Sequence, residues 1–131
     1  MSEISMRTVG PLNSGAAVGG AGVATAHAPS TIRINGLLVG IYVKYNHAPP
    51  AATTDVTIKT VGGNGTPPSQ TILTITDGAT DGWFYPQAIR HTAAAAAIAD
   101  QYGPFPIDDY VDVAIAQADA LDNVDVWLLL A

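Results

Sequence analysis

The carboxyl-terminal quarter of the chain constrains the fold most, because it contains two runs in which apolar residues alternate strictly with other residues. The apolar positions are Val111, Val113 and Ile115 in the first run, 108–117, and Val124, Val126, Leu128 and Leu130 in the second, 123–130. A period of two places one row of side chains on a single face of a strand. The segment between the runs, 118–122, is short and carries two aspartates. The pattern therefore predicts an antiparallel hairpin that closes near the carboxyl terminus.

Three further segments have the same extended character. Residues 32–45 alternate apolar positions with Tyr42 and Lys44, which predicts a central strand with possible bulges at Gly36 and Gly40. Residues 54–61 and 69–76 alternate in the same way, and a loop rich in glycine and proline separates them. We expect these two segments to form a loose hairpin.

The number of short strands decides the fold class. Several short strands, turns of proline and glycine, and the lack of a strong amphipathic helix predict an all-β, antiparallel β-sandwich or jelly-roll-like domain over residues 31–131. The alanine-rich segment 92–100 favours a helix by intrinsic propensity, but a helix this short is marginal without packing. We predict a crossover loop there and leave a short helix open.

The amino-terminal residues 1–30 have a different composition. Gly10, Gly15, Gly19, Gly20 and Gly22 interrupt any periodicity, so we predict an extended N-terminal arm. The small residues at 24–28 are compatible with an edge strand. An arm this apolar either packs along its own domain or reaches a neighbouring protein.

Composition limits the function classes. A length of 131 residues suits one domain, and charged residues make up 12%, about half of the usual share of roughly 25%. This deficit indicates a surface that contacts other protein, although threonine and serine on the outside of a β-protein also explain it. The five basic residues are scattered, which excludes a phosphate-binding stripe for nucleic acid.

The sequence also predicts neither a membrane span nor a secretory signal. The longest apolar run, 127–131, is far below the roughly 20 residues that a transmembrane helix requires. No cationic start precedes an apolar core. The absence of cysteine excludes disulfides and thiolate metal sites.

No group of residues predicts a reaction. The histidines His27, His47 and His91 lack metal-ligand spacing, and the turn with Asp77 and Asp81 lacks the acidic ladder of a calcium loop. Adjacent carboxylates at Asp108 and Asp109 point to opposite faces of an extended chain, which is unsuitable for paired-carboxylate catalysis. No serine sits in a nucleophile elbow. We therefore predict no catalytic, cofactor or metal site.

One aromatic cluster stands out. Trp83, Phe84 and Tyr85 follow a turn at 77–82. Aromatic residues beside a turn form a sugar-stacking platform in some proteins, but they more often fill the end of a sandwich or an interface. We predict that these three residues lie in the core or at a protomer interface.

Five segments together resemble the small head proteins of tailed bacteriophages, and in particular their capsid decoration or cement proteins. These segments are 40–46 with Pro49 and Pro50, 54–58, 80–86, 108–117 and 123–130. The resemblance covers roughly residue 36 to the end and matches the amino-terminal segment less well. It implies a compact β-sandwich, commonly a homotrimer, on the outer surface of the capsid of the virion. There the protein would bind the major capsid protein and stabilise the shell without catalysis or a cofactor.

Four of the five basic residues lie in the first 60 residues, which carry two acidic residues, whereas residues 61–131 carry one basic and nine acidic residues. We therefore place the capsid-binding contacts in the arm, at Arg7, Val18, Val23 and Thr25. The alternative function is a carbohydrate-binding β-sandwich module of a phage tail or head fibre. That alternative predicts exposure of some of Trp83, Phe84, Tyr85 and Tyr102.

Overall fold

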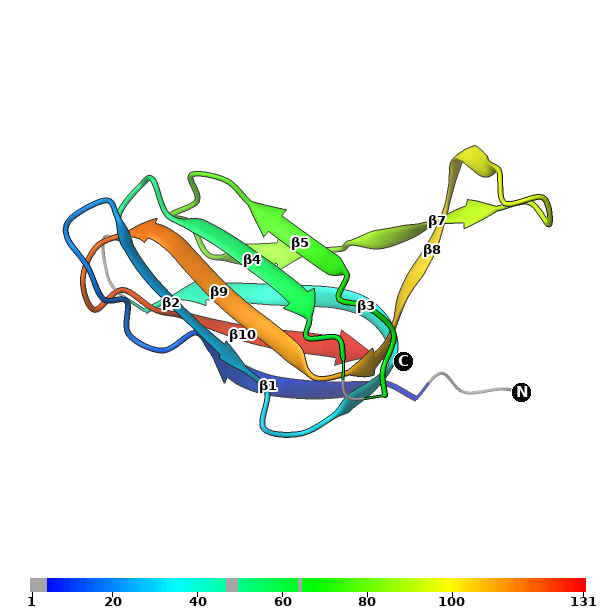
Figure 1. The fold of residues 1–131 in the computed structure, drawn as a ribbon, viewed down its shortest axis with the longest axis horizontal. Helices are drawn as coiled ribbons and strands as arrows, with labels where there is room; N and C mark the ends of the chain where they lie inside the picture. Colours follow the sequence, from blue (N-terminus) through cyan, green and yellow to red (C-terminus); the bar gives the residue numbers. More distant parts are fainter. Residues whose placement is uncertain (1–4, 47–49, 64) are drawn as a thin grey trace.

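The computed structural model describes residues 5–46, 50–63 and 65–131, and these residues form strands, turns and loops without a helix (Figure 1). The strands are β1 (Arg7–Asn13), β2 (Ala24–Pro29), β3 (Ile34–Tyr45), β4 (Asp55–Thr60), β5 (Thr71–Ile75), β6 (Gly82–Phe84), β7 (Gln87–His91), β8 (Ala97–Asp109), β9 (Val111–Ala118) and β10 (Val124–Leu130). In this described part, no helix has the length and apolarity needed to cross a membrane.

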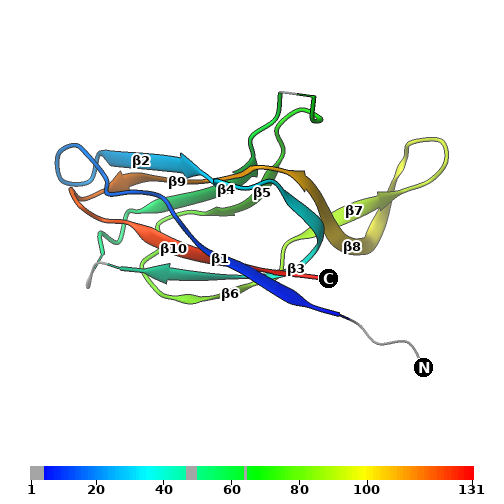
Figure 2. The ribbon, with the colours of Figure 1, turned by 90° about the horizontal axis from the view of Figure 1, so that it is seen from below.

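The strands form two antiparallel sheets that pack face to face (Figure 2). One sheet has the order β1-β10-β3-β8-β7, with β6 also paired to β3, and the other has the order β2-β9-β4-β5. Without β6 and β7, strands one and ten, two and nine, three and eight, and four and five each pair as neighbours. This nesting of pairs is the strand order of a jelly roll. The predicted all-β, antiparallel sandwich is confirmed.

The core lies between the two sheets and is built from the alternating rows seen in the sequence. Val56 and Ile58 of β4, and Ile41 and Val43 of β3, are fully buried. Aliphatic side chains of this kind suit the facing surfaces of a sandwich, because each buried one contributes about 1.5–3 kcal/mol. β3 is central in its sheet, as its sequence predicts, since β10 pairs along one side and β6 and β8 along the other.

The hairpin predicted for the carboxyl-terminal runs is wrong, although both strands exist. β9 pairs with β2 and β4, whereas β10 pairs with β1 and β3, so the two strands belong to different sheets. The turn between them is held by the Asp122 carboxylate, which accepts the Asp119 backbone N–H at 3.0 Å. The turn thus takes the chain from one sheet to the other. The buried rows of β9 and β10 therefore face each other across the core.

The division into an arm at 1–30 and a domain from 31 is also corrected for the described residues from Ser5 onward. β1 forms the edge of one sheet beside β10, and β2 forms the edge of the other beside β9. Ala17 and Ala24 are 1% and 0% exposed. The small residues of this segment allow it to lie against both sheets, so it is an integral part of the sandwich. Residues 1–4 lie outside the described part.

The segment between β5 and β8 is an insertion into the jelly-roll order. It contains β6, which pairs with residues 41–43 of β3, and β7, which pairs with the first part of β8. The second part of β8, residues 105–109, pairs with β3. The crossover loop or helix expected at 92–100 is instead the turn of the β7–β8 hairpin and the start of β8. The turn is closed by the N–H of Thr92, which donates to the carbonyl of Ala96 at 2.8 Å.

Candidate functional site

The most prominent surface feature is the projecting hairpin, which we define as residues 87–104. It extends away from the sandwich, and only its base continues into a strand that pairs with β3 (Figure 1). None of its residues is buried. Ile89 and Tyr102 pair across the two strands and are 41% and 50% exposed.

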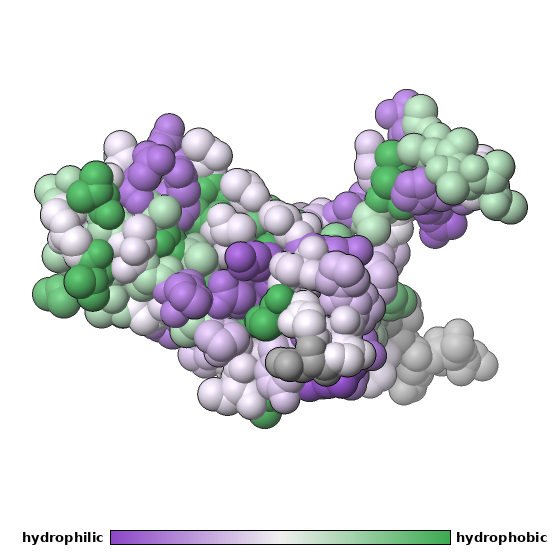
Figure 3. All heavy atoms as spheres, viewed as in Figure 1, coloured by the Kyte–Doolittle hydropathy of each residue, from purple (hydrophilic) through white to green (hydrophobic). Residues whose placement is uncertain are grey.

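The turn of the projecting hairpin is apolar and almost uncharged. Five consecutive alanines, 93–97, form the turn and the start of β8, and Ile98 follows them. Figure 3 shows this end of the molecule as a mostly apolar surface. Arg90 and Asp100 are its charged residues. A surface with small side chains and few charges permits close approach by another protein, because little desolvation is required.

A second apolar surface, the apolar tip, lies at the opposite end of the sandwich (Figures 1 and 3). It consists of Val18, Val23 and Leu121, which are 79%, 68% and 70% exposed. The two loops that carry them are joined, because the Gly22 N–H donates to the Asp119 carboxylate at 2.9 Å. Two of the predicted capsid-binding residues, Val18 and Val23, therefore lie together on an exposed surface.

The other two predicted capsid-binding residues lie elsewhere. The Arg7 guanidinium hydrogen-bonds to the backbone carbonyl and side chain of Asn35, next to the edge of the first sheet. Thr25 pairs with Val18 through two backbone hydrogen bonds of 2.9 and 3.1 Å, and its side chain lies on the outer face of β2. The structure thus brings Val18, Val23 and Thr25 near one another and leaves Arg7 apart.

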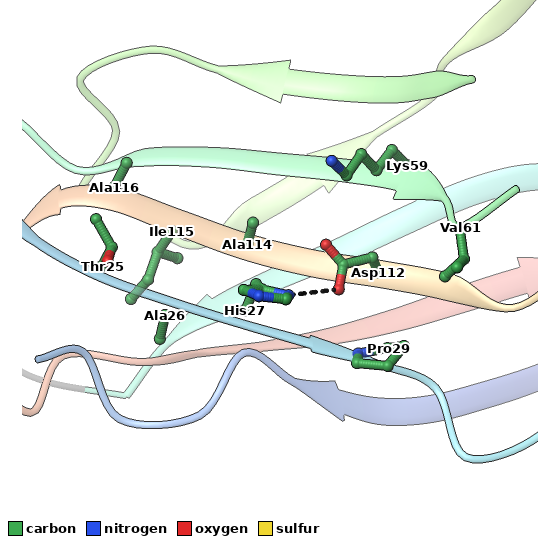
Figure 4. A pocket seen from close by; sticks show the side chains of 10 residues that line it. All are labelled: Thr25, Ala26, His27, Pro29, Lys59, Val61, Asp112, Ala114, Ile115 and Ala116. Carbon is green, nitrogen blue, oxygen red and sulfur yellow. Dashed lines mark hydrogen bonds and ion pairs between the residues drawn. The ribbon is translucent and has the colours of Figure 1, made fainter. Parts of the chain in front are cut away.

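The outer face of β2, β9 and β4 contains a shallow depression of about 500 Å³ (Figure 4). Its floor includes Ala114 and Ala116 of β9, whose small side chains create the hollow. The His27 ring nitrogen Nδ1 lies 3.2 Å from the Asp112 carboxylate at its edge. Among the described residues, no side-chain hydrogen bond links His27 to a hydroxyl.

The predicted aromatic cluster divides between two environments. Phe84 is half-buried and packs against the core, whereas Trp83 and Tyr85 are 52% and 64% exposed. The alternation along β6 explains the difference, because neighbouring residues of a strand point to opposite faces. A core location is thus corrected for Trp83 and Tyr85, for which a protomer interface remains a prediction.

Sequence reasoning missed two groups of surface residues. Tyr42 and Trp127 lie beside Trp83 on the outer face of the first sheet, with ring centroids 5.2 Å apart for Tyr42 and Trp83 and 5.9 Å apart for Tyr42 and Trp127. The sequence did contain a signal, because Tyr42 and Trp127 occupy the alternate, outward-facing positions of strands whose inward-facing positions are aliphatic. The projecting hairpin was missed because its alanines carry no alternation of polar and apolar residues.

The turn at 77–82 is tied to neighbouring segments by hydrogen bonds. Asp81 accepts the Tyr45 backbone N–H at 2.8 Å, and the Asp77 N–H donates to Asp55 at 3.0 Å. Asp108 is exposed and Asp109 is buried, which confirms that the two point to opposite faces. Within residues 5–46, 50–63 and 65–131, no three histidine or acidic side chains converge as metal ligands. His91 is exposed on β7, and His47 lies outside the described residues.

Comparison with known proteins assigns no family and no function to the chain. No family model matches the chain, and no match is found among curated proteins or among solved structures.

Proposed function

We propose that the chain is a capsid decoration (cement) protein that binds the outer surface of the icosahedral head of a tailed bacteriophage. Its role would be structural and non-enzymatic, and its partners would be the major capsid protein and other copies of itself. The resemblance of residues 36–131 to such proteins motivates the proposal. The observation that carries it is the projecting hairpin, which has no supporting surface within the described part of its own chain.

The hairpin supports a docking role on energetic grounds. A two-stranded hairpin alone is marginally stable in water, and this one exposes both of its faces. Contact with another protein would bury Ile89 and Tyr102 and would contribute about 1.5–3 kcal/mol for each large apolar side chain. The alanines at 93–97 would let backbones approach closely. An exposed apolar extension of this kind is typical of a protein interaction site.

The apolar tip supports a second contact. Val18 and Val23 are among the most exposed large apolar residues in the described part of the chain, and they lie at the end opposite the hairpin. Two surfaces at opposite ends suit a protein that bridges neighbouring subunits of a shell. A homotrimer would repeat both contacts three times, and avidity would then exceed the affinity of one footprint.

The first test measures the copy number of the chain in purified phage particles from its source by quantitative mass spectrometry. We expect a fixed simple ratio to the major shell protein, as required for a protein bound at every equivalent site. Detection of only a few copies would favour a tail or fibre protein. Absence from the particles would contradict the proposal.

The second test adds purified variants to shells that lack this chain and measures the bound amount by sedimentation. The double variant Ile89→Ser/Tyr102→Ser should bind at least about tenfold more weakly, because truncation of central apolar contacts commonly costs more than 1.4 kcal/mol. Ile32→Ser is the matched control, since Ile32 is 58% exposed and lies outside the hairpin. Val18→Ser/Val23→Ser tests the apolar tip separately. Equal binding of the hairpin variant and the control would contradict docking through the hairpin.

The proposed homotrimer is tested by the mass of the protein in solution. Analytical ultracentrifugation of the full chain over a range of concentrations should give a species with three times the chain mass of 13.4 kDa. If the chain is monomeric both free and on the shell, the trimer is excluded while the decoration role stays testable.

A second candidate function, carbohydrate binding, is favoured by the exposure of Trp83 and Tyr85. These rings lie on the outer face of the first sheet, next to β3, and not on the projecting hairpin.

A further inference from the structure

The outer face of the first sheet carries an aromatic face, which we define as Tyr42, Trp83, Tyr85 and Trp127. Trp127, Tyr42 and Trp83 are register partners across β10, β3 and β6, so their rings lie in one row. The row contains both tryptophans of the chain. Ile41, Val43, Val126 and Leu128 of the same strands lie in the core and Phe84 packs against it, so the aromatic face is additional to the packed core.

The two most exposed rings have similar orientations. The planes of Trp83 and Tyr85 are within 10° of parallel, and their centroids are 6.4 Å apart. Tyr85 lies over Gly40, because a Cβ atom at this glycine would meet two carbon atoms of the Tyr85 ring at 3.1 and 3.2 Å. The missing side chain at Gly40 therefore makes room for the ring. Tyr42 packs against Trp83 at an interplanar angle of 60°.

Polar side chains lie next to the aromatic row. Lys44 lies two residues from Tyr42 on β3, and Asp125 lies two residues from Trp127 on β10. Lys44 and Asp125 are register partners, and their parity places them on the same face as the two aromatic residues. Asn13 of β1 donates to the Asp125 carboxylate at 2.8 Å. The surface thus combines exposed aromatic rings with amide, ammonium and carboxylate groups. Small-molecule sites commonly place a few polar groups beside an apolar surface in this way.

We propose that the aromatic face binds a chain of β-1,4-linked pyranose sugars. The face of such a sugar ring carries C–H groups with partial positive charge, and the face of an aromatic ring is negative. A β-1,4 linkage keeps consecutive sugar rings in a flat ribbon, which suits two aromatic rings of similar orientation. The sugar hydroxyls then reach Lys44, Asp125 and Asn13. Because Tyr85 lies over Gly40 and Trp83 packs against Tyr42, the rings are in place before binding, which then orders few side chains.

This inference makes the second candidate function specific and does not depend on docking through the hairpin. It is tested by titration of the full chain with cellohexaose and chitohexaose, and with the α-1,4-linked maltohexaose as a comparison. Both tryptophans report on the aromatic face, so we expect a change in tryptophan fluorescence with at least one of the two β-linked sugars. Maltohexaose should bind at least about tenfold more weakly. No change with either β-linked sugar would overturn the inference.

Variants locate the binding by isothermal titration calorimetry. Trp83→Ala and Tyr85→Ala should each weaken binding about tenfold or more, and Trp83→Phe should restore most of the affinity lost in Trp83→Ala. Gly40→Val keeps all four aromatic residues but displaces Tyr85, so it should also weaken binding. Tyr110→Ala, at an exposed tyrosine outside the aromatic face, should leave it unchanged. Unchanged binding in Trp83→Ala and Tyr85→Ala would place the sugar elsewhere and overturn the assignment.

The shell-binding assay separates this inference from the decoration role. If the aromatic face contacts capsid protein instead, Trp83→Ala reduces shell binding while neither β-linked sugar binds. If the decoration role fails and the sugar inference holds, the chain is absent from particles but binds a β-linked hexasaccharide.

Discussion

Tyr45 is buried in the core, and its hydroxyl has no hydrogen-bond partner among the described residues. The hydroxyl lies against Gly78, where a Cβ atom would approach the oxygen to 2.5 Å. Burial raises the pKa of Tyr45, and the nearby negative charge of Asp81 raises it further. The folded protein therefore keeps the phenol neutral to a higher pH than the unfolded chain does.

Replacement of this hydroxyl should stabilise the fold. We expect Tyr45→Phe to raise the free energy of unfolding by about 1 kcal/mol, because it removes a buried polar group without a partner. Since the unfolded chain ionises first, the wild-type protein should lose stability as the pH rises above about 10. Tyr45→Phe should lose less over this pH range. Thermal unfolding at several pH values measures both effects.

Tyr110→Phe is the matched control for Tyr45→Phe, because Tyr110 is 39% exposed. The control should change stability by less than about 0.5 kcal/mol. Equal responses to pH in the two variants would contradict the assignment to Tyr45.

Asp108 and Asp109 are neighbours with different surroundings. Asp109 is 4% exposed, and its carboxylate accepts the backbone N–H groups of Gly62 at 2.8 Å and Tyr110 at 2.7 Å. Asp108 is exposed and forms a 3.0 Å ion pair with Arg33. The same substitution at the two positions therefore isolates the effect of burial.

We expect Asp109→Asn to destabilise the protein by about 1–3 kcal/mol, because an amide offers one acceptor oxygen and sets an N–H group against a donor. Asp108→Asn should cost no more than about 1 kcal/mol, as is usual for an exposed ion pair. Urea denaturation of both variants checks the difference. A cost at Asp108 as large as that at Asp109 would contradict this account.

Among the elements, the hairpin of β7 and β8 is separable from the jelly roll. Its pairs Gln87 with Pro104, Ala88 with Gly103 and Ile89 with Tyr102 lie beyond the part of β8 that pairs with β3. Replacement of residues 90–101 by Asn-Gly, which favours a tight hairpin turn, should change the free energy of unfolding by less than about 1 kcal/mol. Thermal unfolding of the shortened protein measures this. A large loss of stability would mean that the hairpin supports the sandwich.

The insertion between β5 and β8 contributes to two of the three proposed binding features, the aromatic face and the projecting hairpin. β6 brings Trp83 and Tyr85 to the outer face of β3, and β7 with β8 builds the hairpin. The eight nested strands supply a rigid frame beneath it, and connecting segments on rigid scaffolds often carry function. Fold analogy alone would not assign a function here, because jelly rolls serve many roles.

For the whole molecule, the amino-terminal segment decides whether the sandwich holds together. β1 and β2 each complete one sheet, and Ala17 and Ala24 are buried in the core. We expect deletion of residues 1–30 to abolish cooperative unfolding, because it exposes an edge of each sheet and part of the core. Differential scanning calorimetry and amide NMR dispersion check this. The hairpin-shortened protein is the control, and retention of a cooperative transition by both would contradict the role of β1 and β2.

The predicted capsid-binding contacts in residues 1–30 therefore require point substitutions as their test. Deletion of residues 1–30 would remove all four predicted capsid-binding residues, Arg7, Val18, Val23 and Thr25. Because the segment is part of both sheets, such a deletion would confuse loss of binding with loss of the fold. Point substitutions at Val18 and Val23 avoid the problem, since both side chains are largely exposed.

The sequence by itself determined the strands β3, β4, β5, β9 and β10, the buried rows of β4, β9 and β10, and the fold class. Val56 and Ile58, and the rows in 111–115 and 124–130, are buried as their period predicts. The prediction succeeds because alternation is a local property of the sequence. Within each strand, the apolar positions indicate which face is buried. The exposure of Asp108 and burial of Asp109 follow from the same rule.

The hairpin expected for 54–61 and 69–76 is confirmed by the pairing of β4 with β5, but only the tertiary structure decided the partners of the other strands. β9 and β10 follow one another closely, yet they lie in opposite sheets, because a period of two specifies a buried face and not a neighbour. The tertiary structure also decided that residues 7–29 join both sheets and that the alanines of 93–97 turn a projecting hairpin. The sequence did not predict the aromatic face for the same reason. Its residues come from three segments that are distant in sequence, and the pairing of β10, β3 and β6 alone brings them together.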